Sequence, residues 1–318
     1  MPDTIWIERG KQLAGVTDSV ARAVIGLSGK NDRNGADHIC VEEMRKELNG
    51  LPYTMKVVIG EGEKDEAPML YSGEVLGSGG EEMDLIVDPL ECTGNFAKGL
   101  PDSMTVILAA EKDSVMHVPG TYMEQILLPL PADPGPEVFE MERKEVLNRV
   151  SKVLGIPVSD LTVIVQNRPR HENIIEDIRS AGASVALIES GSISAACDIF
   201  ARSRGRYNLL WGSFGAPEGL VLGFLSRANG YRFYGRIDPH NEKTQKEAED
   251  LGVLGRVLRG DQWIAGGGVL VMTGLHDSTW LRGVRRSYEN GGVQHTTSTV
   301  IWSLNQKLEL ECSNGRFH

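Results

Sequence analysis

Two neighbouring segments of the chain share one pattern, an aliphatic run that ends in acidic residues at a turn. The segments are VVIGEGEKDEAPMLY (57–71) and DLIVDPLECTGN (84–95). Residues 57–59 and 85–87 are predicted to form buried strands. Glycines permit a tight turn after the first strand, and Pro89 is expected to end the second. The pattern therefore predicts that several carboxylates gather where two buried strands end.

Carboxylates gathered at the ends of buried strands repel one another, and a bound cation is the usual solution. Oxygen ligands alone favour a hard divalent ion, Mg²⁺ or Mn²⁺, over zinc. The alternative is that these acids are solvated turn residues, as most surface acids are. One segment by itself favours that alternative. Two adjacent segments, the second ending in Asp-Pro-Leu-Glu-Cys-Thr, favour the metal site.

The bulk composition is that of an ordinary globular protein. The chain has 318 residues, 41% hydrophobic and 24% charged, which is enough for one large domain or two modest lobes. The formal net charge of −11 argues against nucleic-acid binding, which needs basic patches. It does not exclude a small phosphorylated substrate, because a metal and a few arginines can reverse the field locally.

The sequence also bears on location. No apolar run approaches the ~20 residues of a membrane helix, and the N-terminal MPDTIWIERGK lacks the pattern of a secretory signal. These features predict no association with membranes. Scattered cysteines without a CxxC pair favour reduced thiols in a cytoplasmic protein over disulfides or zinc. The cysteines are Cys40, Cys92, Cys197 and Cys312.

The first part of the chain is predicted to be mainly helical before the acidic strands. Residues 6–27 carry apolar side chains at helical spacing, and 38–49 read as a second helix after the polar turn 28–37. The proline-rich stretch 129–137 marks the expected boundary between two lobes. The expected lobes are 1–135 and 136–318.

Beyond this boundary strands and helices alternate, which implies sheet layers covered by helices. The glycine clusters 77–82 and 265–272 lack the strand–GxGxxG–helix order of a dinucleotide site and are expected to be loops. The further helices expected are 141–155, 171–182, 192–202, 216–230 and 241–252. The further strands expected are 104–111, 161–168, 184–189, 207–212, 268–275 and 297–304.

Six segments resemble class II fructose-1,6-bisphosphatase, a branch of the metal-dependent sugar and inositol phosphatase superfamily. The segments are GEGEKDEAPMLY, DPLECT, TYMEQI (121–126), NRPRHE (167–172), GAPEG (215–219) and DSTWLRGVR (277–285). The resemblance implies a mixed α/β fold, a layered α-β-α-β-α sandwich of two lobes with the metal site in the cleft between them. It also implies a homo-oligomer, a dimer or a tetramer.

The resemblance implies a metal site with ligands from both lobes, namely Asp37, Glu61, Asp88 and Glu218. The placement of Glu61 and Asp88 at strand ends agrees with this. Asp37 and Glu218 precede or open predicted helices, so the residues alone favour helix-capping or dipole-complementing acids. With the resemblance, metal ligation is the better interpretation.

The resemblance also implies which residues act on the substrate. Glu61, Asp88 and Thr93 are the implied catalytic residues, with Thr93 orienting the attacking water while Glu61 or Glu63 assists. The residues alone allow a simpler interpretation, in which Tyr122 is an ordinary aromatic residue of a strand. In the same way, Arg168 and Arg170 form a basic turn ahead of a helix. The implied substrate-binding residues are Arg33, Glu91, Cys92, Thr93, Tyr122, Arg168, Pro169, Arg170, Ser190, Gly191, Ser192 and Gly215.

The chain departs from the family pattern at several of these positions. The family usually has glycine at Cys92, lysine at Arg33 and Asp-Gly-Asp at Ser190-Gly191-Ser192. Two acceptors of sugar hydroxyls are thereby lost, and Ser213 and Phe214 add bulk ahead of GAPEG. These departures predict intact metal and phosphate chemistry with a rebuilt sugar pocket.

The sequence therefore predicts a cytoplasmic, Mg²⁺- or Mn²⁺-dependent phosphatase acting on a small phosphorylated sugar. The resemblance implies fructose 1,6-bisphosphate as the substrate. One alternative is a paralogue that acts on a different sugar phosphate in a specialised biosynthetic pathway. Another is an inactive sugar-phosphate-binding regulatory protein, which the retained carboxylates disfavour because buried acids without a cation are costly.

Overall fold

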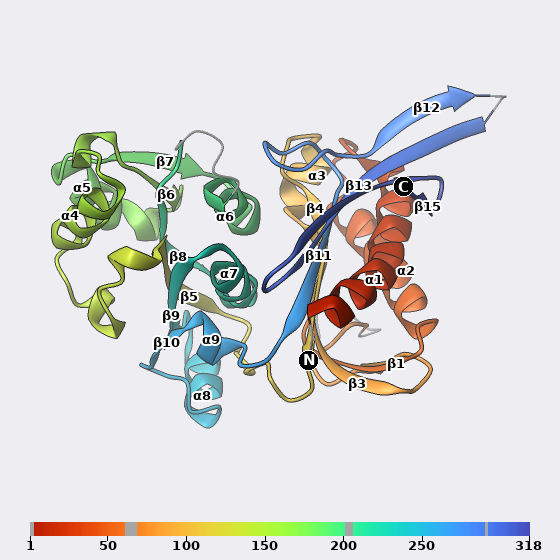
Figure 1. Cartoon of the computed structure of the whole chain (residues 1–318), viewed down its shortest axis with the longest axis horizontal. Helices are drawn as coiled ribbons and strands as arrows, with labels where there is room; N and C mark the ends of the chain where they lie inside the picture. The colour runs from red at the N-terminus through yellow and green to blue at the C-terminus, as the bar shows by residue number, and fades with distance from the viewer. Residues whose placement is uncertain (1–2, 61–68, 201–205, 290–291) are drawn as a thin grey trace. The chain divides into compact units, whose positions relative to one another are not determined.

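The structure is a computed structural model that describes residues 3–60, 69–200, 206–289 and 292–318 (Figure 1). The chain forms two compact units, each with its own sheet and its own helices. The first unit holds residues 1–116 and 265–318, and the second holds residues 117–264. The mixed α/β class expected from the sequence is confirmed.

The observed division of the chain differs from the expected lobes 1–135 and 136–318. The chain leaves the first unit ahead of the proline-rich stretch 129–137 and returns to it near residue 265. The return has a structural cause, because β11 (Gly268–Gly274) pairs antiparallel with β4 (Met104–Glu111) along its whole length. Pairing between strands so far apart in sequence leaves no local signal at the boundary.

In the first unit the described strands form one mixed sheet in the order β15-β14-β13-β11-β4-β3-β1-β2, with β12 paired to β13. Within it β1 and β3 are parallel, and the other pairs are antiparallel. Besides β4 and β11, the strands are β1 (Tyr53–Ile59), β2 (Val75–Leu76), β3 (Glu81–Glu91), β12 (Arg285–Glu289), β13 (Gly292–Ser303), β14 (Lys307–Ser313) and β15 (Arg316–Phe317). The helices are α1 (Asp3–Val24), the 3-10 turn η1 (Ile25–Leu27), α2 (Arg33–Asn49) and α3 (Thr93–Lys98).

Helix α1 packs on the sheet through the apolar positions that its sequence repeats. Leu13, Val16 and Val20 are buried and share one core cluster with Val271 of β11 and Ile301 of β13. In Figure 1, α1 and α2 lie on the same face of this sheet. The helix expected at 6–27 is thus confirmed, with its last residues forming η1.

Helix α2 begins earlier than the expected residue 38. Asp32 caps it, because its Oδ1 accepts a hydrogen bond from the backbone N–H of Gly35 at 2.9 Å. The expected polar turn 28–37 is therefore too long. Asp37 lies inside the helix, not ahead of it, so the expectation that it follows a turn is corrected.

Strand β3 continues through Pro89, which the sequence predicted would end it. The pairing of β3 with β4 shifts register between Asp88 and Glu91, so Pro89 lies in an irregular, bulge-like stretch. A bulge accommodates proline because the missing N–H is not needed for the ladder. The acidic residues of this segment are thus held by the sheet and do not lie in a loose turn.

In the second unit the described strands form a sheet in the order β10-β9-β5-β8-β6-β7. β6 is parallel to β7 and β8, and the other pairs are antiparallel. The strands are β5 (Tyr122–Pro129), β6 (Thr162–Gln166), β7 (Ser184–Ile188), β8 (Leu209–Gly215), β9 (Tyr231–Asp238) and β10 (Val257–Arg259). The helices are α4 (Arg143–Leu154), α5 (Glu172–Ser180), α6 (Ser192–Phe200), α7 (Ala216–Asn229), α8 (Glu242–Asp250) and α9 (Gly260–Trp263). The 3-10 turns are η2 (Leu130–Ala132), η3 (Pro136–Phe139), η4 (Val158–Asp160) and η5 (Pro169–His171).

Helices cover both faces of this second sheet, with α4 and α5 on one face and α6 and α7 on the other (Figure 1). Strand β5 shows why, since its side chains alternate between the two faces. Ile126 and Leu128 join the core cluster beneath α4 and α5. Met123 and Gln125 lie next to Gly219 of α7. The expected alternation of strands and helices therefore leads to a sheet covered on both sides.

Several strands escape the sequence pattern, among them β9 and β14. β9 (YRFYGRID) mixes aromatic and charged residues, and β14 (KLELECS) alternates exposed charged residues with half-buried ones. Neither gives the continuous aliphatic run by which strands such as β4 and β11 are predicted. Among the described residues, no helix is both long enough and apolar enough to cross a membrane.

We predict opposite effects for alanine at two glycines of α1. A Cβ atom at Gly10 would lie 2.4 Å from Cγ2 of Ile301 and 2.8 Å from Cγ2 of Val269. Those β-branched side chains cannot easily rotate away, so Gly10→Ala should cost about 1–3 kcal/mol of unfolding free energy. A Cβ at Gly15 meets nothing within 4 Å, so Gly15→Ala should gain up to about 1 kcal/mol. Chemical denaturation of both variants measures the difference, and equal effects would contradict the observed packing of α1.

Candidate active site

The strand directions of the second sheet bring several loop segments to one edge. β6, β7 and β8 run in the same direction, so their last residues Gln166, Ile188 and Gly215 lie at that edge. β5 is antiparallel to β8, and its first residue Tyr122 pairs in register with Gly215. In open sheets of this kind, ligands bind outside the carboxyl ends of the strands.

Three of the segments expected to bind substrate follow these strand ends directly, namely 167–172, 190–192 and 215–219. The structure therefore brings together residues that the sequence separates widely. The carboxyl edge of β6, β7 and β8, together with the start of β5, is the candidate substrate-binding edge.

Arg170 is held at this edge by neutral acceptors and by an aromatic ring. Its Nε and Nη2 donate to the backbone oxygen of Ser213 at 3.1 and 2.8 Å, and Nη2 also donates to Oε1 of Gln166 at 2.7 Å. The guanidinium carbon lies 4.2 Å from the ring centroid of Tyr122. No carboxylate neutralises Arg170 among the described residues, so its charge remains available to an anionic ligand.

Arg168 has a different environment. Its Nη2 donates to the backbone oxygen of Glu189 at 2.7 Å, and its Nη1 lies 3.4 Å from Oε2 of the same residue. The contact ties the turn that begins at Pro169 to the segment that begins at Ser190. Arg168 is therefore partly neutralised, whereas Arg170 is not.

The segment Ser190-Gly191-Ser192, where the chain departs from the family pattern, leads into α6, which begins at Ser192. Gly191 has a φ of 84°, a left-handed conformation that glycine adopts without strain. Its backbone oxygen accepts from the N–H of Ala195 at 3.0 Å, and Ser192 is buried. Residues 190 and 192 thus lie on either side of a glycine turn, directly after Glu189.

His171, which the sequence did not single out, fixes the position of Ser213. The backbone oxygen of Gln166 can only accept, so His171 Nδ1 donates to it at 2.7 Å. Nε2 must then accept from the backbone N–H of Ser213, at 2.8 Å. Burial lowers the pKa of His171, and the charge of Arg170 lowers it further, so the neutral ring is favoured. A histidine directly after Arg170 was the available signal.

Asp238 also belongs to this edge and was not predicted. Its Oδ2 accepts a hydrogen bond from Oγ of Ser213 at 2.7 Å, and it pairs in register with Tyr122 at the end of β9. Because β9 itself escaped prediction, an acid at its end carried no recognisable signal.

Glu218 lies in the first turn of α7 and folds back over Gly215. A Cβ atom at Gly215 would lie 1.9 Å from Oε2 of Glu218, so only glycine permits this arrangement. The backbone oxygen of Gly215 accepts from Nε2 of Gln125 at 2.8 Å. The sequence expectation that Glu218 opens a helix is confirmed, and its carboxylate lies at the same edge as Tyr122.

In the first unit, carboxylates gather at the end of β3. Burial raises the pKa of the Asp88 carboxyl well above its usual range, and the charges of Glu91 and Asp37 act in the same direction. Oδ1 of Asp88 accepts from the backbone N–H of Leu90 at 3.2 Å. A divalent cation would turn this repulsion into attraction, so the oxygen donors present here suit a hard metal ion.

The segment after Glu91 makes a sharp turn into α3. Cys92 adopts a left-handed conformation with a φ of 62°, which glycine would adopt at lower cost. Oγ1 of Thr93 donates to the backbone oxygen of Leu90 at 2.9 Å. The guanidinium of Arg33 lies beside Gly94, where an added Cβ would be 3.4 Å from Nη2. Arg33 is thus placed next to the turn that carries Thr93.

Part of the predicted metal site cannot be placed. Glu61 and Glu63 lie outside the described residues, directly after β1. Among the residues that are described, no group of three or more His, Cys, Asp or Glu side chains forms a metal site. β1 and β3 are parallel, so Ile59, the last residue of β1, lies toward the same edge of the sheet as Asp88.

The fold defines a mixed α/β protein, with a buried carboxylate at the end of β3 in one unit and an arginine without a carboxylate partner among the described residues in the other. The sequence model of the family described as bacterial fructose-1,6-bisphosphatase, glpX-encoded, matches residues 8–309. The chain therefore belongs to the class II fructose-1,6-bisphosphatase family, as its motifs indicate. Membership of this family implies a requirement for a divalent metal ion.

Individual relatives agree with this assignment. The D-fructose 1,6-bisphosphatase class 2/sedoheptulose 1,7-bisphosphatase of Synechococcus sp. (strain JA-2-3B'a(2-13)) is 34% identical over 329 residues, covering 95% of this chain and 93% of that protein. The protein of the same name from Microcystis aeruginosa (strain NIES-843 / IAM M-2473) is 34% identical over 320 residues, covering 92% and 91%. The similarity thus extends over nearly the full length of both relatives.

We predict that His171 makes stability depend on pH. Its folded pKa lies below the ordinary value of 6.5, so its stabilising effect is complete above pH 6.5 and is lost as pH falls through the folded pKa. Protonated Nε2 could no longer accept from Ser213. Melting temperatures measured between about pH 8 and pH 5 should fall more for the native protein than for His171→Gln. Parallel curves would show that the histidine does not stabilise the edge through its neutral form.

Proposed function

We propose that the protein hydrolyses a phosphate ester of a sugar bisphosphate and releases inorganic phosphate. The observation that supports this most is the match to bisphosphatases over more than nine tenths of the chain. The names of those relatives make fructose 1,6-bisphosphate and sedoheptulose 1,7-bisphosphate the first substrates to test. Hydrolysis of phosphate monoesters is extremely slow in water, so the protein must supply electrostatic stabilisation and precise placement.

The proposed metal ligands are Asp37, Glu61, Asp88 and Glu218, with Mg²⁺ or Mn²⁺ as the ion. A divalent ion supplies a bound water of lowered pKa and a positive charge for phosphate oxygens. Burial is the main cause of the raised pKa of Asp88, and the charges of Glu91 and Asp37 add to it; those neighbouring carboxylates support the assignment, because they favour a cation. In this proposal Thr93 orients the attacking water, Glu61 or Glu63 accepts its proton, and Glu91 and Cys92 complete the turn that faces the phosphate.

The proposed substrate contacts come from the substrate-binding edge of the second unit and from Arg33. Arg170 keeps its charge there and stacks on Tyr122, so it suits a phosphate group. Arg168 and Pro169 act mainly by fixing the turn, because Arg168 is bonded to Glu189. Gly215 pairs with Tyr122 and leaves room for the carboxylate of Glu218. Ser190 and Ser192, with Gly191 between them, are proposed to set the choice of sugar.

The proposal also includes a homo-oligomer and a cytoplasmic location. A homo-oligomer is supported by the ribbon of β12 and the start of β13, where Tyr288 is 77% and Val293 49% exposed. Isolated two-stranded ribbons are marginal in water and gain stability from a partner. A cytoplasmic location is supported by the four cysteines, none of which forms a disulfide. No observation favours the alternative of an inactive binding protein.

We predict that activity requires a divalent metal. Phosphate release from the two bisphosphates should vanish after treatment with EDTA and return with Mg²⁺ or Mn²⁺; the ion that restores more turnover is the better cofactor. Full turnover after rigorous removal of metal would contradict the metal-dependent mechanism. If neither bisphosphate is hydrolysed under any metal condition, a wider panel of sugar phosphates tests the substrate assignment separately.

We predict that Asp88→Asn weakens metal binding without destabilising the metal-free fold. Asp88 has a raised folded pKa, so its ionisation costs stability as pH rises through that value, and asparagine removes the cost. The metal-free variant should be at least as stable as the native protein at neutral pH, while kcat falls by orders of magnitude. Mg²⁺ should raise the melting temperature of the native protein only. An equal metal-induced rise in the variant would exclude Asp88 as a ligand.

We predict that aspartates at 190 and 192 favour fructose 1,6-bisphosphate. Charged acceptors contribute about 1.5–3 kcal/mol per hydrogen bond and neutral ones about 0.5–1.5, so Ser190→Asp/Ser192→Asp should raise kcat/KM for this substrate by about tenfold or more. Ser184→Asp, at the exposed start of β7, is the control for negative charge added elsewhere and should change nothing. A native kcat/KM of ~10⁴ M⁻¹s⁻¹ or above, unimproved by the double change, would refute a rebuilt sugar pocket.

A further inference from the structure

The substrate-binding edge includes the end of one more strand, β9. β9 is antiparallel to β5, which is antiparallel to β8, so β9 ends at the same edge as β8. The last residue of β9 is Asp238, which pairs in register with Tyr122. Ligand-binding groups of open sheets lie outside the carboxyl ends of the strands. Asp238 therefore lies where a ligand is expected, although it has no role in the mechanism proposed above.

Asp238 and Arg170 are both bonded to one residue, Ser213. Oδ2 of Asp238 accepts from Oγ of Ser213 at 2.7 Å. Nε and Nη2 of Arg170 donate to the backbone oxygen of Ser213 at 3.1 and 2.8 Å, and its backbone N–H donates to His171 at 2.8 Å. All three polar groups of Ser213 are thus bonded. They hold a carboxylate and a guanidinium one residue apart, within the span of a phosphorylated sugar.

Tyr122 lies between these two charged groups in the order of the strands. β5 separates β8 from β9, so the hydrogen bond from Ser213 to Asp238 reaches across the strand of Tyr122. The ring of Tyr122 contacts the guanidinium of Arg170 at 4.2 Å and the ring of His240 at 5.6 Å between centroids. Tyr122 is nevertheless 37% exposed. A ligand at this edge would therefore meet an aromatic side chain that is already held in place.

The second carboxylate oxygen of Asp238 is available to a ligand. Asp238 is exposed, and its Oδ1 makes no hydrogen bond or ion pair with any residue that the structure describes. Glu189, at the same edge, differs because it accepts from Asn167 at 2.7 Å and lies 3.4 Å from Nη1 of Arg168. An ionised carboxylate can only accept, so its natural ligand partner is a hydroxyl group. A sugar phosphate offers a hydroxyl for Asp238 and a phosphate for Arg170.

We propose that Asp238 is a specificity-determining residue, whose Oδ1 accepts a hydrogen bond from a hydroxyl of the sugar whose phosphate contacts Arg170. This role rests on the proposed function, because it adds a contact to the same substrate. It supplies a charged hydroxyl acceptor in a chain that has serine at 190 and 192. Three strands separate β7, which precedes Ser190, from β9. Sugar hydroxyls are thus recognised on the β9 side of Tyr122 as well.

Two variants separate contact with the substrate from positioning of Ser213. Asp238→Asn keeps an oxygen that can accept from Ser213 but removes the charge, whereas Ser213→Ala removes the hydroxyl and keeps the carboxylate. If Asp238 binds a sugar hydroxyl, Asp238→Asn should weaken binding of the sugar phosphate more than Ser213→Ala does. The reverse order would show that Asp238 only positions Ser213, and the proposal would be wrong.

Binding is measured by calorimetry in saturating Mg²⁺ with fructose 6-phosphate and with inorganic phosphate. Each ligand carries one phosphate group, but only the sugar carries hydroxyls on carbon. Asp238→Asn should weaken binding of fructose 6-phosphate by about fivefold or more, because a charged acceptor makes the stronger hydrogen bond. It should leave phosphate unchanged or bound more tightly, since a negative charge is removed. Equal weakening of both ligands, or equal affinities in the native protein, would refute the hydroxyl contact.

Asp160→Asn is the matched control. Asp160 is also exposed and accepts from a serine hydroxyl, that of Ser159, at 3.2 Å. It precedes β6 and so lies at the opposite edge of the sheet. This variant should bind both ligands like the native protein, and equal effects of the two variants would exclude the site. If Asp238→Asn does not fold, Asp238→Glu keeps the charge but displaces the oxygens, and it should weaken fructose 6-phosphate alone.

Turnover gives an independent readout. In Asp238→Asn the KM for the sugar bisphosphate should rise by about fivefold or more while kcat changes less, because Asp238 contacts the sugar and not the attacking water. An unchanged KM would contradict the proposed contact. Absence of all sugar-phosphate turnover in the native protein would overturn the proposed function, while the calorimetric comparison would still decide the role of Asp238.

Discussion

The direction of the parallel strands is the constraint on which the candidate site depends. β6, β7 and β8 place their last residues at one edge, and the register of β5 sets Tyr122 opposite Gly215. In the first unit the parallel strands β1 and β3 likewise run toward one edge, where β3 carries Asp88 and Glu91. The loops that follow parallel strands lie together at one edge of the sheet. Loops held by a rigid sheet are where binding groups are usually found.

The polar groups at these edges are arranged so that charge is left available for a ligand. Arg170 is oriented by a backbone oxygen and an amide, which cost it no charge, and neutral His171 holds the peptide of Ser213 in place. Asp88 shows the opposite case, a carboxylate whose burial and acidic neighbours disfavour its ionisation. The edge in the second unit thus favours an anion, and the edge in the first unit favours a cation.

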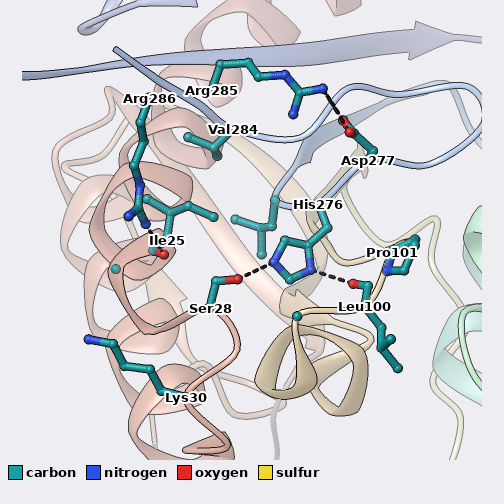
Figure 2. A pocket seen from close by; sticks show the side chains of 13 residues that line it. Ile25, Ser28, Lys30, Leu100, Pro101, His276, Asp277, Val284, Arg285 and Arg286 are labelled. Carbon is teal, nitrogen blue, oxygen red and sulfur yellow. Dashed lines mark hydrogen bonds and ion pairs between the residues drawn. The ribbon is translucent and has the colours of Figure 1, made fainter. Parts of the chain in front are cut away.

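Neutral partners also orient the polar groups of a pocket in the first unit (Figure 2). His276 is kept neutral by its hydrogen bonds, and Arg286 is oriented by the backbone oxygen of Ile25 with no carboxylate partner among the described residues. The charge of Arg286 is therefore not neutralised by these contacts, as is the case for Arg170 in the second unit.

The sequence by itself determined the local elements, the family and the residue types of the site. Periodic apolar positions revealed α1, the aliphatic run revealed β4, and the acidic motifs revealed the class II fructose-1,6-bisphosphatase family. These signals are local, because side-chain periodicity and short motifs lie within a few turns of chain. Only the tertiary structure decided that residues 265–318 rejoin the first unit, that β3 passes through Pro89, and that Ser28 meets His276. Those facts depend on strand pairing and packing between residues far apart in the chain, for which a single sequence carries no pattern.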